Sequence, residues 1–194
     1  MSALSAQLPN DLAVMLPEII LAVSAMLLLI VGVFRTDRAM GVVSALAVLA
    51  MVVAGYVMLS AGSGSASAFG GSFVADNFTR FAKVLILLGT IATLAMAPDF
   101  FKAAKIDKFE FPVLMLLSTV GMMLMVSANS FIALYMGLEL QSLSLYVLAS
   151  FHRDSVRSTE AGLKYFVLGA LASGMMLYGI SFIYGFTGTT QFTG

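Results

Sequence analysis

The chain has 194 residues, of which 60% are hydrophobic and only 10% are charged, and its formal net charge is zero. A soluble domain carries about 25% charged residues, so a soluble fold of this size would leave much apolar surface on its exterior. The composition therefore predicts an integral membrane protein embedded in the lipid bilayer. The absence of net charge gives no electrostatic basis for binding nucleic acid.

The chain contains no cysteine and a single histidine, His152. It therefore lacks the thiolates that hold iron–sulfur clusters or cysteine-based zinc, and it cannot supply two histidines to a haem. No glycine-rich phosphate loop, catalytic triad or metal-ligand cluster stands out. The sequence thus predicts no cofactor site and no redox chemistry in this chain.

Apolar stretches of about 20 residues predict helices that cross the bilayer. The chain has six of them, so we expect an all-α membrane protein, a polytopic bundle that forms a single transmembrane domain over residues 1–194. In chain order the predicted helices are 14–34, 39–61, 80–98, 111–127, 130–151 and 160–185.

Pro17 and Glu18 lie in the outer end of the first predicted helix. Proline suits the first helical turn, and a carboxylate suits the positive end of the helix dipole, so a structural role is favoured for Glu18. Asp11 and Glu18 lie where a cleaved signal peptide would carry basic residues, which argues against such a peptide.

Residues 62–75, GSGSASAFGGSFVA, predict a flexible loop before the third helix, and Asp76 is expected to cap that helix. Lys83 lies one turn from Arg80, near the start of the same helix. We expect the Lys83 side chain to snorkel to water, with a role in proton transfer as the weaker alternative. The tight turn at 127–130 predicts that the fourth and fifth helices are antiparallel neighbours.

Glu139 lies near the middle of the fifth predicted helix, roughly 18 Å from one end at 1.5 Å per residue. A glutamate is too short to reach water from there, and ionisable groups inside a membrane usually face the bundle interior. Tyr135, Ser142 and Tyr146 share its helix face and make a stripe of hydroxyl groups. This pattern favours a proton-exchanging carboxylate, and a structural carboxyl that holds helices together is the alternative.

Lys164 lies about one turn into the sixth predicted helix, roughly 6 Å from its end. The spacing leaves two interpretations open. Lys164 is either a buried lysine that exchanges protons or an interfacial lysine paired with Glu160, four residues earlier. The depth estimates separate Lys164 from Glu139 by roughly 12 Å, so we expect water or another side chain to connect them.

Small residues four apart in the sixth predicted helix, Gly169 with Ser173 and Ala170 with Gly174, predict close helix packing. The connections after the first, third and fifth helices fall on one side of the bundle and are rich in basic residues. The positive-inside rule places them in the cytoplasm and both ends of the chain in the periplasm. These residues are Arg35, Arg38, Lys102, Lys105, Lys108, Arg153 and Arg157, against Arg80 on the other side.

The segment GLELQSLSLYVLASFHRDSVRSTEAGLKYFVLGALASGMMLYGISFIYGFTGTTQF, residues 137–192, closely resembles the subunit N family of bacterial proton-translocating NADH:quinone oxidoreductase, respiratory complex I. DNFTRFAKVL at the start of the third helix fits the same family more loosely. The resemblance implies an antiporter-like inverted-repeat fold in the bacterial inner membrane, among other membrane-arm subunits of the complex. It also implies that Glu139 and Lys164 belong to a proton path.

In such a complex, NADH, FMN, iron–sulfur clusters and quinone are expected in other subunits, and this chain would contribute proton translocation. Family members are considerably longer, so the resemblance implies an N-terminal portion of the full subunit. Two alternatives stay open. One is a subunit of a secondary cation/proton antiporter, and the other is a structural scaffold in which Glu139 and Lys164 only hold helices together.

Overall fold

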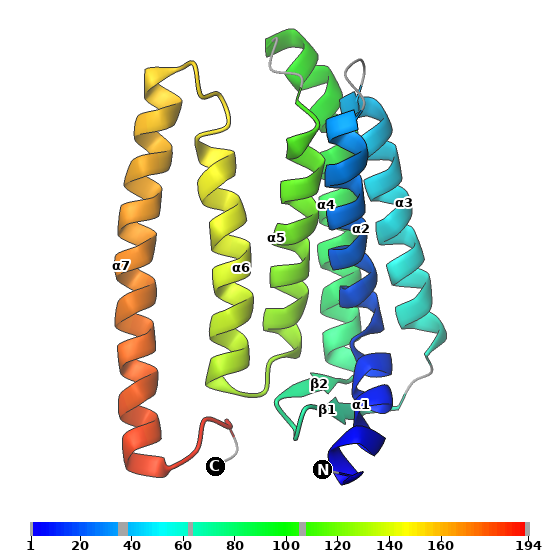
Figure 1. Ribbon diagram of the computed structural model, residues 1–194, viewed down its shortest axis with the longest axis vertical. Coiled ribbons are helices and arrows are strands. Elements are labelled where there is room, and N and C mark those ends of the chain that lie inside the picture. Colours follow the sequence, from blue (N-terminus) through cyan, green and yellow to red (C-terminus); the bar gives the residue numbers. More distant parts are fainter. Residues whose placement is uncertain (1, 35–38, 62–63, 105–107, 193–194) are drawn as a thin grey trace.

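The structure is a computed structural model that describes residues 2–34, 39–61, 64–104 and 108–192. Helices make up most of these residues, and two short strands form one hairpin (Figure 1). The elements are α1 (Ser2–Val14), α2 (Leu16–Phe34), α3 (Ala39–Ser60), β1 (Ala66–Ala68), β2 (Phe73–Ala75), α4 (Asn77–Ala104), α5 (Glu110–Ser127), α6 (Phe131–Ala149) and α7 (Val156–Thr187).

Six helices of the described residues, α2 to α7, are long and apolar enough to cross a membrane, which confirms the predicted number. The predicted ends agree with the structure within a few residues for most helices. The largest differences are in α4, which runs on to Ala104, and in α7, which begins at Val156 instead of residue 160. Helix α1 was not predicted, because its sequence contains polar residues and Pro9 and is much less apolar than the spans.

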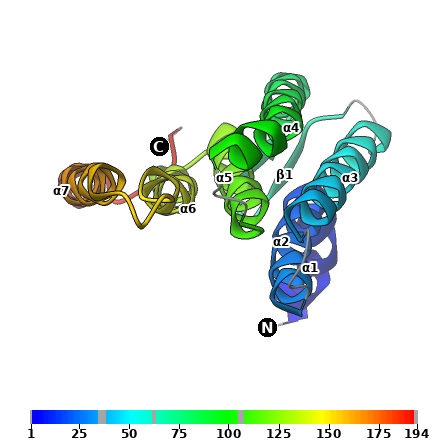
Figure 2. The same cartoon turned by 90° about the horizontal axis from the view of Figure 1, so that it is seen from above.

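The spanning helices form a compact group and an extension (Figures 1 and 2). Helices α2, α3, α4 and α5 pack around one another, whereas α6 packs on α5 and α7 packs on α6, so that α5, α6 and α7 lie in a row. The odd-numbered spans α3, α5 and α7 begin at one end of the bundle, and the hairpin and both chain termini lie at the other. Lys108, Arg153 and Arg157 therefore lie on one side, as predicted, whereas Arg35, Arg38 and Lys105 lie outside the described residues.

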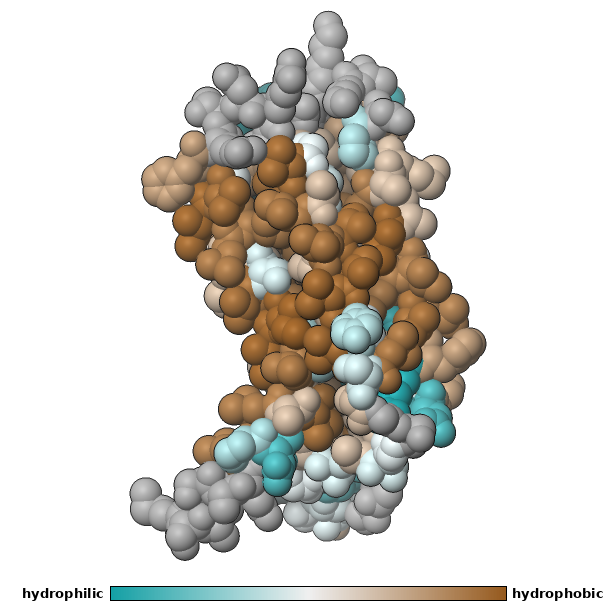
Figure 3. Space-filling view, turned by 90° about the vertical axis from the view of Figure 1, so that its right-hand side faces the viewer, coloured by the Kyte–Doolittle hydropathy of each residue, from teal (hydrophilic) through white to brown (hydrophobic). Residues whose placement is uncertain are grey.

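The core lies where α2, α3, α4 and α5 meet, and it consists of aliphatic side chains and methionines that are almost fully buried. Lipid is as apolar as these side chains, so close packing rather than the hydrophobic effect holds such helices together. The face drawn in Figure 3 carries a broad apolar belt, with more polar residues toward the hairpin end, as expected for a protein that lipid surrounds. The largest fully buried apolar side chains are Leu21, Met51, Leu94, Leu116 and Met123.

The segment predicted to be a flexible loop is in part a β-hairpin, so that prediction is wrong for residues 66–75; residues 62–63 lie outside the described residues. Strands β1 and β2 pair antiparallel, and the turn between them uses positive φ at Phe69, Gly70 and Gly71. The amide of Asn129 donates to the carbonyl of Gly71 at 2.8 Å. The hairpin is ordered because it packs on the α5–α6 turn, a contact between distant parts of the sequence.

Two local predictions next to the hairpin are confirmed. The Asp76 side chain accepts a hydrogen bond from the Thr79 backbone N–H at 2.7 Å, and the Thr79 hydroxyl accepts from the Asp76 N–H at 2.8 Å. These reciprocal bonds cap the start of α4. Helices α5 and α6 are antiparallel neighbours, as the short turn between them requires.

Candidate functional site

An ion pair is buried in the compact group of helices, near the hairpin end. The Lys83 amine on α4 lies 2.6 Å from Glu18 Oε1 on α2, and the two side chains are 3% and 0% exposed. The expectation that Lys83 snorkels to water is therefore wrong. Its helix packs against α3, α5 and the hairpin. The Glu18 carboxylate, which reaches over from α2, meets the amine before the amine reaches solvent.

Glu18 lies in the first turn of α2, next to Pro17, as the sequence indicated. Neither of its carboxylate oxygens accepts a well-directed hydrogen bond from the described residues, although Lys83 lies beside one of them. The Lys83 amine also lies 4.8 Å from the centre of the Phe73 ring, in β2. A carboxylate and an aromatic face from distant segments thus surround one ammonium group.

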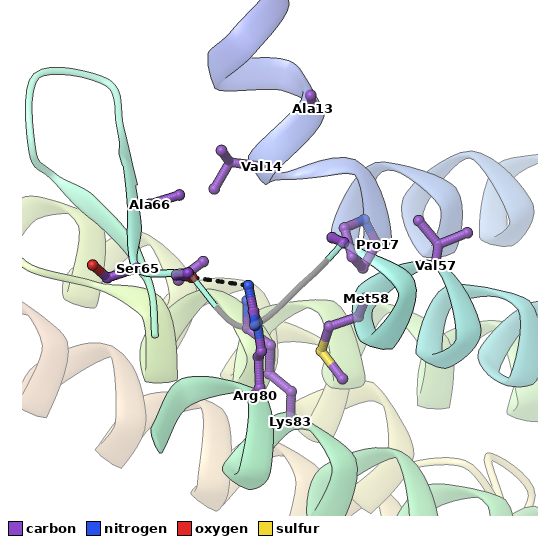
Figure 4. A pocket seen from close by; sticks show the side chains of 12 residues that line it. Ala13, Val14, Pro17, Val57, Met58, Ser65, Ala66, Arg80 and Lys83 are labelled. Carbon is purple, nitrogen blue, oxygen red and sulfur yellow. Dashed lines mark hydrogen bonds between the residues drawn. The ribbon is translucent and has the colours of Figure 1, made fainter. Parts of the chain in front are cut away.

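Beside this pair is a cavity of about 300 Å³, between α1, α3, the hairpin and the start of α4. Lys83 and Arg80 reach toward it from α4, and Pro17 and Met58 border it from α2 and α3 (Figure 4). Arg80 donates to the backbone carbonyl of Gly64 at 3.0 Å. The cavity therefore combines apolar walls with two cationic side chains.

Glu139 is half-buried in the middle of α6, and its Oε1 atom is buried without a hydrogen-bond partner among the described residues. Tyr146, two turns along the same helix face, packs edge-to-face against Tyr165 and Phe166 of α7. Its hydroxyl also fills the space beside Gly169. Because residues seven apart share a helix face, Glu139 lies on the side of α6 that faces α7.

The predicted hydroxyl stripe is present on α6, but the described residues show no hydrogen bond from it to Glu139. Tyr135 and Ser142 are half-buried, and Tyr146 is buried. Glycines set how closely α6 approaches α5. A Cβ atom on Gly121 would lie 2.5 Å from the backbone nitrogen of Gln141, and one on Gly137 would lie 2.8 Å from the backbone nitrogen of Met125. Sequence reasoning missed this contact.

Lys164 lies on α7 and pairs with Glu160 at 2.6 Å, and both side chains are more than half exposed. The buried residues of α7 are Gly162, Ser173 and Ile180, which face α6. Lys164 follows Gly162 by two residues, about 200° around the helix, so it points away from α6. The structure thus shows the Glu160 pair that the spacing allowed.

The contact between Gly162 and Ser150 sets the register of α6 against α7, because a Cβ atom on that glycine would lie 2.4 Å from Ser150 Cβ. Counting from this contact, Glu139 and Lys164 lie about 14 Å apart along the helix axes. They also lie on faces that point in different directions, so the structure does not bring them together. Small residues of α7 were predicted to allow close helix packing. Of these, Gly169 and Ser173 face α6, whereas a Cβ atom on Gly174 would meet no other atom within 4 Å.

Sequence reasoning also missed a buried polar contact in the compact group. The hydroxyl of Thr119 on α5 donates to the hydroxyl of Thr90 on α4 at 3.2 Å. Thr90 is two turns from Lys83 on the same face of α4. A single threonine in an apolar helix gives no sequence pattern that distinguishes a buried threonine from a lipid-facing one. Over the described ranges, no group of three or more acidic or histidine side chains is placed to hold a metal ion.

Comparisons with known proteins show which proteins this chain is similar to. The profile of the family "NADH:quinone oxidoreductase/Mrp antiporter, TM" matches residues 128–194. The chain is 57% identical to NADH-quinone oxidoreductase subunit N 1 of Rhizobium meliloti over 94% of its own length. It is 55% identical to NADH-quinone oxidoreductase subunit N of Paramagnetospirillum magneticum over 95% of its length. In both cases the chain spans only 38% of the relative's length.

Solved structures show the same fold. A chain of respiratory complex I from Thermus thermophilus with bound aureothin matches with a TM-score of 0.76 and 30% identity, over 92% of this chain and 38% of that one. A chain of the membrane-bound sulfane sulfur reductase, an archaeal respiratory membrane complex, matches with a TM-score of 0.74 at 19% identity, which supports the fold alone. The arrangement of α2 to α7 therefore occurs inside longer chains of respiratory membrane complexes.

Proposed function

Because the chain belongs to the subunit N family of NADH-quinone oxidoreductase, we propose that it forms part of an antiporter-like membrane-arm subunit that moves protons across the bilayer. Electron transfer from NADH to quinone would take place in other subunits, which would bind NADH, FMN, iron–sulfur clusters and quinone. The support is the subunit N similarity along nearly the whole chain and the fold shared with a chain of complex I. The other membrane-arm subunits are the expected partners.

The environment of Glu139 is the main structural support for a role in proton transfer. It is a carboxylate at mid-helix in a membrane span, and one of its oxygens is buried with no partner among the described residues. A carboxyl group used only to join helices would be expected to make hydrogen bonds to them. An unpartnered carboxyl oxygen on the α7-facing side of α6 is free to accept a proton or a water molecule.

Lys164 is the second residue of the proposed proton path, and it lies on the face of α7 that points away from α6. Nearly all of α7 beyond its α6-facing stripe is exposed in this chain, and the chain spans 38% of its relatives' length. We expect further helices of a complete subunit to cover that face and to surround Lys164. A path from Glu139 to Lys164 would then run around α7 through water and through residues outside this chain.

The charge distribution supports an orientation in the bacterial inner membrane. Lys108, Arg153 and Arg157 lie at the end of the bundle where α5 and α7 begin, and the hairpin lies at the opposite end. The positive-inside rule places the basic end in the cytoplasm, and the hairpin end with both termini of this chain in the periplasm.

The test uses Glu139→Gln in the complete subunit within the assembled complex. Gln keeps the shape of the side chain but cannot exchange a proton, so we expect fewer protons pumped per NADH oxidised. Proton uptake by inverted membrane vesicles and NADH oxidation are measured together. Glu139→Asp should retain part of the pumping, and Asp154→Asn, in the exposed α6–α7 connection, is the matched control that should change nothing. An unchanged proton-to-electron ratio in assembled Glu139→Gln complex contradicts the proposal.

A second candidate is a subunit of a secondary cation/proton antiporter, because the matching family profile covers Mrp antiporters as well. It predicts sodium-dependent proton movement in vesicles without NADH or quinone. If Glu139→Gln abolished such sodium-driven movement and left NADH-driven pumping unchanged, the antiporter function would be favoured.

A further inference from the structure

We propose that Lys83 and Glu18, together with the cavity beside them, form a second proton-exchange site at the hairpin end of the bundle. Lys83 is the group that exchanges a proton with water in the cavity, and Glu18 is the residue that positions and balances it. The inference deepens the proposed function and rests on it. It concerns the pair on α2 and α4, remote from the α6–α7 face that holds Glu139.

The first argument is the energetic cost of the pair. Removing two charges from water costs several kcal/mol per ion, and a well-packed apolar pair is often equally or more stable. Ionisable groups within membrane spans are therefore rare and usually serve transport or catalysis. Here Glu18 lacks well-directed hydrogen bonds to its oxygens, so the pair is not the fully bonded arrangement that would best stabilise a fold.

The second argument is access to water. The cavity of about 300 Å³ is bordered by Lys83, and one water molecule occupies about 30 Å³ in the liquid, so several waters fit. Such waters need polar partners, which Lys83 and Arg80 provide among the apolar walls (Figure 4). Part of the wall is Ala61, which is exposed, so the cavity lies close to the surface at this end.

The third argument is that the hairpin holds the ammonium group in place. Phe73 of β2 covers Lys83 with its ring and also pairs through its backbone with Ala128, in the turn before α6. The Asn129 backbone N–H donates to Ser72 at 2.9 Å, which ties the same turn to the hairpin. Lys83 is thus in contact with a segment that is attached to the helix carrying Glu139.

The exchange is a simple proton transfer. A Lys83 N–H bond breaks, the proton passes to a cavity water, and the electron pair remains on Nζ as a neutral amine. The Glu18 carboxylate then carries an uncompensated negative charge, which favours the arrival of the next proton at Nζ. Thr90, bonded to Thr119, is the next buried polar side chain along this face of α4 and marks the direction of the membrane interior.

The functional test compares Lys83→Met with the double variant Glu18→Gln/Lys83→Met, each in the complete subunit of the assembled complex. Both variants should pump fewer protons per NADH oxidised, because neither can exchange a proton at position 83. The double variant removes the unpaired charge, so a pair with only a structural role would pump normally in it, and that result overturns the inference. Lys108→Met, the same change at the opposite end, is the control.

The result with Glu139→Gln separates the two proposals. If Glu139→Gln lowers the proton-to-electron ratio and the Lys83 variants do not, this inference fails and the proposed function stands. If none of them changes the ratio in assembled complex, both fail.

A second measurement tests the cavity without altering the ion pair. The chain has no native cysteine, so Val57→Cys in the cavity wall introduces a single thiol into it. A membrane-impermeant thiol reagent should label this position from the hairpin side, as detected by mass spectrometry of the modified peptide. Leu94→Cys, in the buried core, should stay unlabelled. No labelling at position 57, or labelling from the opposite side only, overturns the inference.

Discussion

Two lysine–glutamate pairs in this chain have the same separation and opposite surroundings. Lys83 and Glu18 join two helices at 2.6 Å and are 3% and 0% exposed. Lys164 and Glu160 lie on one helix at 2.6 Å and are 69% and 57% exposed. The distance between the charged atoms is therefore no guide to what each pair contributes, because the energy of an ion pair depends on how much water surrounds it.

The surroundings differ because the two regions are packed differently. The first pair belongs to the compact group of α2, α3, α4 and α5, where each helix touches several others. The second belongs to α7, which packs mainly on α6 among the described helices. If the further helices proposed for a complete subunit cover the face around Lys164, the second pair would come to resemble the first.

The largest effect is expected for Glu18→Ala, which leaves the Lys83 ammonium buried without its partner. Removing one member of a buried pair costs about 3–5 kcal/mol, so the free energy of unfolding should fall by that order. It can be measured by denaturing the purified complete subunit in mild detergent. Glu18→Gln/Lys83→Met should recover most of the loss. Equal stability of Glu18→Ala and the unmodified protein would show that the pair is hydrated.

An intermediate effect is expected for Gly121→Ala at the contact that joins the extension to the compact group. The new methyl group would lie 2.5 Å from the backbone nitrogen of Gln141, so α6 must move away from α5, at about 1–3 kcal/mol. The melting temperature in detergent should fall. Gly89→Ala is the matched control, because a Cβ there meets no atom within 4 Å. A similar melting temperature for both variants would contradict the close packing of α5 and α6.

The smallest effect on stability is expected for Glu160→Gln. An exposed pair four residues apart contributes about 0.3–0.5 kcal/mol, so the free energy of unfolding of this chain should barely change. The same substitution in the complete subunit sharpens the comparison. If helices outside this chain bury Lys164, the loss there should exceed about 1 kcal/mol, whereas an equally small loss in both would show that the face stays exposed to water.

Local sequence patterns were enough to predict many features of this structure. Six apolar stretches gave the spans, Asp76 was identified as the cap of α4, and the spacing of Glu160 and Lys164 allowed for the pair that the structure shows. These features depend on residues within a few positions of each other. The role predicted for Glu139 stays a prediction, since no observation on this chain measures proton transfer.

Long-range contacts account for what the sequence did not reveal. Lys83 was expected to reach water because one turn of helix separates it from the charged residues at the start of α4. It is buried because Glu18, 65 positions earlier, and Phe73 in the hairpin cover it. The hairpin itself was predicted to be a loop because its partners, Ala128 and Asn129, lie two helices further along the chain.

The sequence by itself determined that this chain crosses a membrane as six helices and that its basic connections share one side, because apolar length and charge placement act residue by residue. Only the tertiary structure decided which charged groups meet. Glu18 on α2 pairs with Lys83 on α4. In contrast, Glu139 and Lys164, the two most recognisable charged residues, point in different directions and lie about 14 Å apart along the helix axes. Helix rotation and register set those positions, and they arise from packing of glycines and side chains that no single segment encodes.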